Sequence, residues 1–132
     1  MPSGPPRVVQ PIDDVPVYRY SDLRPAPIQR DIAGISTCRG ACPYQCAWCI
    51  EPVIGRLQGR TKLQFHSAAR VVDQIAALMD EDITRFTIQD SFFVGGDAKL
   101  IALSEELIRR QIRPRHLNVF AHPESFTALG LT

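Results

Sequence analysis

The sequence has few of the features that mark exported, membrane-spanning or nucleic-acid-binding proteins. No charged N-terminal segment precedes an apolar stretch, and no apolar run approaches the length that a bilayer requires. Lys62 and Lys99 are the only lysines, and the arginines are scattered, so the basic stripe of a duplex binder is absent. We therefore expect a cytoplasmic protein with no membrane partner and no evident nucleic-acid partner.

Cysteine is absent from the sequence except in one short segment. Cys38, Cys42, Cys46 and Cys49 all lie there, and so does the single tryptophan, Trp48. In a reducing compartment, a cluster this tight is more typical of metal or redox chemistry than of disulfides. The segment is therefore the first candidate for a functional site.

The length and composition indicate one ordinary globular domain. The chain has 132 residues, a net charge of +1 and 45% hydrophobic residues. Residues 1–30 hold seven of the 11 prolines, which fix φ and remove backbone donors, so this part should be an extended, irregular and partly flexible arm. Its apolar residues are too dense for a disordered tail, and we expect some to pack on the body. Residues 31–132 form the predicted domain.

Strand and helix patterns alternate after the arm. The helix patterns follow the 3.6-residue apolar period, and Ser67 and Asp97 are their expected N-caps. Helices of this length between strands favour parallel pairing, which predicts an α/β fold. The small parallel sheet has bare edges, and the chain stops where a third helix begins at 125–131, so we expect a truncated fold. The predicted strands are 32–37, 83–88 and 117–121, and the predicted helices are 68–80 and the segment after Asp97.

The spacing from Cys42 to Cys49 is C-x3-C-x2-C. Three thiolates in one short loop can ligate three irons of a cubane cluster and leave the fourth iron open to another ligand. Zinc prefers four protein ligands, usually as two separated pairs, and no second pair follows here. A small zinc or redox module is therefore the weaker alternative. Cys38 lies outside the triplet, and we expect a buried or spare thiol.

With Trp48 before the third cysteine, this loop resembles the signature of the radical S-adenosylmethionine (SAM) enzymes, C-x3-C-x-aromatic-C. Residues 39–44, Arg-Gly-Ala-Cys-Pro-Tyr, and residues 89–92, Gln-Asp-Ser-Phe, resemble most closely the branch often joined to cobalamin-binding domains. Two departures from that pattern matter. Ala41 is an extra residue between the glycine and the cysteine, and Gln89 replaces the first acid of the second motif.

The resemblance covers about residues 32–130 and implies about half of a partial (βα)6 barrel, built from parallel strand-helix repeats. It implies a 4Fe-4S cluster on Cys42, Cys46 and Cys49, with SAM on the open iron. An electron from the reduced cluster then cleaves SAM, and the 5′-deoxyadenosyl radical abstracts hydrogen from an unknown substrate. The implied electron donor is a reductant such as flavodoxin or ferredoxin, and cobalamin would require an upstream domain that this sequence lacks.

The resemblance also implies roles for residues outside the cysteines. Trp48 would flank the adenine of SAM, and Asp90 or Ser91, after the second strand, would hydrogen-bond its ammonium. The alternatives are a packing aromatic for Trp48 and a turn-capping residue for Asp90. No catalytic residue is assigned. Because the second half of the barrel is missing, three hypotheses stay open: an active enzyme, a non-catalytic fragment that only binds a cluster, and a half-barrel completed by a partner chain or a second copy.

Overall fold

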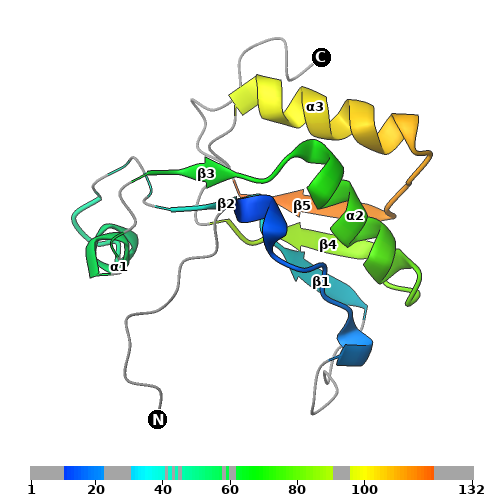
Figure 1. The fold of residues 1–132 in the computed structure, drawn as a ribbon, viewed down its shortest axis with the longest axis horizontal. Helices are drawn as coiled ribbons and strands as arrows, with labels where there is room; N and C mark the ends of the chain where they lie inside the picture. Colours follow the sequence, from blue (N-terminus) through cyan, green and yellow to red (C-terminus); the bar gives the residue numbers. More distant parts are fainter. Residues whose placement is uncertain are drawn as a thin grey trace.

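The computed structural model describes residues 11–22, 31–40, 42, 44, 46–57, 59, 62–90 and 96–120. These residues form a mixed α/β structure with a parallel three-stranded sheet, a two-stranded sheet and three α-helices (Figure 1). The helix predicted at 125–131 lies outside the described residues. No helix in the described ranges combines the length and apolar character of a membrane span.

The main sheet is parallel, as the alternation of strands and helices predicts. Its strands lie in the same order in the sheet as along the chain, and each neighbouring pair is parallel. The predicted strands are confirmed in type, although each is shorter or shifted by one or two residues. The strands are β1 (Ile32–Ile35), β4 (Arg85–Ile88) and β5 (His116–Val119).

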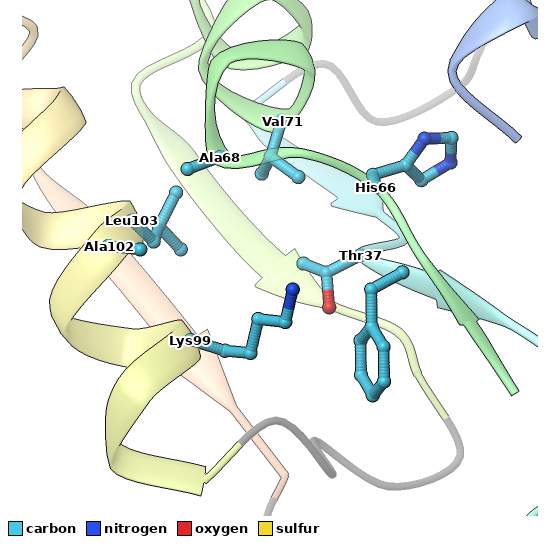
Figure 2. A pocket seen from close by; sticks show the side chains of 8 residues that line it. Thr37, His66, Ala68, Val71, Lys99, Ala102 and Leu103 are labelled. Atoms are coloured by element: carbon cyan, nitrogen blue, oxygen red, sulfur yellow. The ribbon is translucent and has the colours of Figure 1, made fainter.

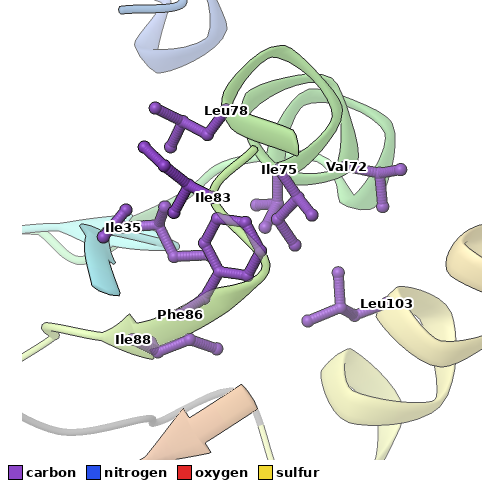
Figure 3. Close-up of a cluster of buried hydrophobic side chains, with 10 residues drawn as sticks. Ile35, Val72, Ile75, Leu78, Ile83, Phe86, Ile88 and Leu103 are labelled. Carbon is purple, nitrogen blue, oxygen red and sulfur yellow. The ribbon is translucent and has the colours of Figure 1, made fainter. Parts of the chain in front are cut away.

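Two amphipathic helices pack on one face of this sheet (Figure 1). They are α2 (Ala68–Met79) and α3 (Gly96–Arg109). Alternate strand residues point to this face, because side chains along a strand alternate between the two faces. Figure 3 shows Phe86 of β4, which is 0% exposed, between side chains of α2 and Leu103 of α3. The core residues are Ala33, Ile35, Val71, Val72, Ile75, Leu78, Ile83, Phe86, Ile88 and Leu103.

The start of α2 agrees with the sequence prediction, and the start of α3 does not. Ser67 is the N-cap of α2, and its hydroxyl accepts a hydrogen bond from the backbone N–H of Arg70 at 3.2 Å. Asp97, however, lies inside the first turn of α3, which begins at Gly96. A carboxylate in a first turn still stabilises a helix through the helix dipole, so the residue type signals the helix start without marking the cap itself.

We predict that Ser67→Ala lowers the free energy of unfolding by about 1 kcal/mol, because it removes the acceptor for an otherwise unpaired helix N–H. Urea denaturation followed by circular dichroism measures the change. Ser104→Ala, at an exposed position inside α3, is the matched control and should leave stability unchanged or slightly higher. Equal losses in both variants would contradict the capping role.

The sequence interpretation missed three short elements around the cysteine segment. Strands β2 (Cys38–Arg39) and β3 (Gln64–Phe65) pair antiparallel, and helix α1 (Glu51–Leu57) follows the last cysteine. The glycine- and arginine-rich composition after Cys49 predicts a loop, which is wrong for Glu51–Leu57. A proline is tolerated in a first helical turn, where its missing N–H leaves no bond unmade, so Pro52 does not prevent this helix.

The N-terminal arm covers the outer edge of β1. The hydroxyl of Tyr20 donates to the carbonyl of Ile32 at 3.1 Å, and the hydroxyl of Tyr18 donates to the carbonyl of Gly34. The next carbonyl, that of Ile35, points the other way and accepts from the N–H of Gln89, just after β4, at 2.8 Å. The expectation that part of the arm packs on the body is therefore confirmed for these residues.

Polar contacts also fix the arm to α2. The side chain of Gln74 accepts from the backbone N–H of Tyr18 at 3.1 Å and donates to its carbonyl at 2.7 Å. At the N-terminus of α2, the carboxylate of Asp13 accepts from His66 at 2.8 Å and from the N–H of Ser67 at 3.2 Å. Burial opposes ionisation of Asp13, but these hydrogen bonds outweigh it and lower the pKa of its carboxyl.

Candidate functional site

The cysteine segment begins at the carboxyl end of β1. After Thr37, the chain forms β2 and then turns at Gly40, where φ is +132°. A side chain at this position would overlap the backbone of Lys62 and Leu63, so only glycine fits. This close approach explains the glycine of the Arg-Gly motif physically. The loop that follows lies at the end of the sheet where parallel α/β proteins carry their chemistry.

The three cysteines of the motif are free thiols in this loop. Cys42 and Cys49 are half-buried and Cys46 is exposed. The N–H of Cys49 donates to the carbonyl of Cys46 at 3.1 Å, and a turn of this kind holds its first and last Cα atoms within about 7 Å. Among the described residues, however, no three His, Cys, Asp or Glu side chains are gathered as a metal site.

The donor set of this loop fits an iron-sulfur cluster by its chemistry. Its three thiols are soft ligands, which iron-sulfur clusters require, and no disulfide engages them. Two of the thiols bracket one hydrogen-bonded turn. Cys42, Cys46 and Cys49 could therefore hold a cluster if the loop brought the first thiol to the other two.

Trp48 is 88% exposed, so the interpretation of it as a packing aromatic is wrong. Two apolar residues that follow it in the sequence, Ile50 and Leu57, are 61% and 82% exposed. An indole this exposed is available to stack on a planar ligand such as adenine. The adenine contact itself stays a prediction.

Asp90 is buried at the carboxyl end of β4, next to the start of the cysteine segment. Its carboxylate accepts from the N–H of Thr37 at 2.9 Å, from the N–H of Cys38 at 3.3 Å and from the hydroxyl of Thr37. In this structure Asp90 therefore has the contacts of a capping residue, which is the alternative interpretation from the sequence. Ser91, the other candidate for the SAM ammonium, lies outside the described residues.

Cys38 is half-buried beside Asp90. Burial, followed by the negative charge of Asp90, raises the pKa of the Cys38 thiol to about 12. Cys38 also lies outside the C-x3-C-x2-C triplet. This agrees with the expectation that Cys38 is a spare thiol.

A small cavity lies between the first turns of α2 and α3 and the end of β1 (Figure 2). Its volume is about 50 Å³, and its walls include Thr37, His66, Lys99 and Leu103. The ammonium of Lys99 lies 5.0 Å from the centre of the Phe65 ring, within cation-π range. This volume suits a few water molecules and excludes a cofactor.

A larger cavity of about 300 Å³ lies between the arm, α2 and the edge of β1. Ser36 and Gln89, which line it, are at the carboxyl ends of β1 and β4. The side chain of Gln89 lies against Gly34, where any larger residue would overlap it. The cavity is at the lower limit of volumes typical of small-molecule sites and reaches the same sheet end as the cysteine loop.

Comparison with models of protein families, with curated proteins and with solved structures gives no match to this chain. The case for a function therefore depends on the motif and on its place in the fold.

Proposed function

We propose that this chain is a radical SAM domain that binds a 4Fe-4S cluster through Cys42, Cys46 and Cys49 and takes SAM as its cofactor or cosubstrate. The observation that carries the proposal is the position of the C-x3-C-x-Trp-C loop at the carboxyl end of β1 in a parallel sheet. Zinc in a structural site prefers four protein ligands, usually as two separated pairs, and no second pair follows the triplet in this sequence.

The order of the strands supports a partial barrel. In doubly wound α/β sheets the strand order reverses and helices cover both faces. Here the order β1, β4, β5 follows the chain, and α2 and α3 lie on one face. One crossover helix per strand on a single face is the arrangement of α/β barrels and also of each half of a doubly wound sheet, so the described strands fit the proposed partial barrel.

Packing distances support the same conclusion. Helices pack about 8–10 Å apart, whereas strands lie about 4.8 Å apart. In an α/β barrel the sheet accommodates this difference by curving, with the helices on its convex side. The opposite face would then be the concave interior, and here it carries the small or polar row Gly34, Thr87 and Asn118.

The roles of the residues follow from their positions. The three thiolates would hold the cluster, which, when bound and reduced, supplies the electron that cleaves SAM. Trp48, exposed in the same loop, would stack on the adenine. Ser36 and Gln89 would present polar groups to a ligand in the cavity between the arm, α2 and the edge of β1. A flavodoxin or ferredoxin is the proposed electron donor.

Anaerobic reconstitution with iron and sulfide tests this proposal. We expect broad visible absorption with about four irons per chain. After reduction and addition of SAM, we expect 5′-deoxyadenosine. A loaded cluster without 5′-deoxyadenosine would indicate a non-catalytic fragment. Stoichiometric zinc after anaerobic purification, with no iron uptake, would refute the proposal and support a zinc module.

A further inference from the structure

Asp90 makes contacts that differ from the role implied by the resemblance. A residue that binds the ammonium of SAM must offer a carboxylate oxygen to the ligand. In this structure both oxygens of Asp90 face the protein: Oδ1 and Oδ2 lie 2.9 Å and 3.1 Å from the N–H nitrogen of Thr37. Asp90 is only 7% exposed, and none of the ion pairs among the described residues includes it.

Several donors converge on this carboxylate. The N–H groups of Thr37 and Cys38 and the hydroxyl of Thr37 all donate to it. Hydrogen bonds to a charged acceptor are about twice as strong as neutral ones. An ammonium that displaced them would leave two backbone N–H groups and a hydroxyl without an acceptor, in a buried place where unpaired donors are costly.

Thr37 is the point where three segments meet. Its N–H is held by Asp90 from the end of β4, and its carbonyl accepts from the N–H of His66, just after β3, at 2.8 Å. Thr37 is itself 8% exposed. The peptide at which the chain leaves β1 for the cysteine loop is therefore held on both sides.

From these contacts we propose that Asp90 is a positioning residue of the cysteine loop and not a ligand of SAM. Its carboxylate fixes the direction in which Cys38 and the loop leave the sheet, and thereby the place of the three cysteine ligands. This inference rests on the proposed function for its cofactor, but the contact network that it describes is testable without one.

The first test uses the full chain without a cluster. Hydrogen-deuterium exchange of the peptides covering residues 37–49 should become about tenfold faster in Asp90→Asn, whose amide replaces one of the two acceptor oxygens with an NH2 donor and removes the charge. Thr37→Val should give a similar change. Thr37→Ser keeps the hydroxyl and should exchange as slowly as the wild type. Asp31→Asn, at the exposed opposite end of β1, is the control for loss of a negative charge. Unchanged loop exchange in Asp90→Asn would overturn the inference.

The second test uses the reconstituted protein. Asp90→Asn and Thr37→Val should both alter the electron paramagnetic resonance spectrum of the reduced cluster before SAM is added, and both should weaken SAM binding by about tenfold. The double variant should be no worse than Asp90→Asn, because the two residues act as one unit. If Asp90→Asn alone lost SAM and Thr37→Val had a wild-type spectrum and affinity, Asp90 would be a SAM ligand. Failure of the wild type to take up iron would instead refute the proposed function, and the exchange test would still decide the role of Asp90.

Discussion

Cys46→Ala is expected to abolish binding of a complete cluster. Cys46 is the exposed member of the triplet, so its replacement removes a ligand without disturbing the core. A cubane held by two thiolates loses one of its three protein bonds to iron, and the remaining species should be unstable. Iron analysis and visible absorption after anaerobic reconstitution measure the loss, and circular dichroism should show an unchanged fold.

Cys38→Ala is the matched control for this result. Its thiol is half-buried and lies outside the C-x3-C-x2-C triplet, so the variant should take up iron as the wild type does. A full cluster in Cys46→Ala would show that the ligand assignment is wrong. Loss of the cluster in Cys38→Ala, with the fold intact, would show that Cys38 also binds it.

Phe86→Ala is expected to lower the free energy of unfolding by about 3–5 kcal/mol, because it leaves a large cavity in the core. Phe86 is fully buried at the centre of the sheet, where β1 and β5 flank β4 and both helices cover it. Small domains are stable by only about 5–15 kcal/mol, so much of this variant should be unfolded or close to unfolding. Chemical denaturation measures the effect.

Phe120→Ala provides the comparison, since the same side chain is removed from a position that is 62% exposed. Its effect should stay within about 0.5 kcal/mol. Similar losses for the two variants would contradict the assignment of the core to the face shared by α2 and α3.

The parts of the fold that the sequence predicts are those set by local patterns. The apolar period of α2 and the Ser67 cap are local, and both are confirmed. The elements missed near the cysteines are short and depend on contacts with other segments. β2 and β3 have two residues each, and they pair across the whole cysteine loop. No periodicity can develop over such lengths.

The candidate site could be predicted only in part. The cysteine triplet can be recognised because its spacing is local. The hydrogen-bond partner of Asp90, however, is Thr37, 53 residues away, and no sequence signal connects the two. The spacing of residues in a motif also does not show which side chains are buried. The sequence alone therefore could not decide whether Trp48 packs or is exposed. The ligand role of the cysteines and the use of SAM stay predictions.

The hydroxyls of Tyr18 and Tyr20, which bond to carbonyls of β1, also limit where a further strand can join the sheet. A sheet extends when a new strand bonds to free carbonyls and amides at an edge. On β1 the carbonyls of Ile32 and Gly34 already accept from Tyr20 and Tyr18, so this edge is closed to a partner while the arm stays in place. A further strand can bond to these two carbonyls only after the arm leaves β1, so the arm competes with any strand that would extend the sheet at this edge.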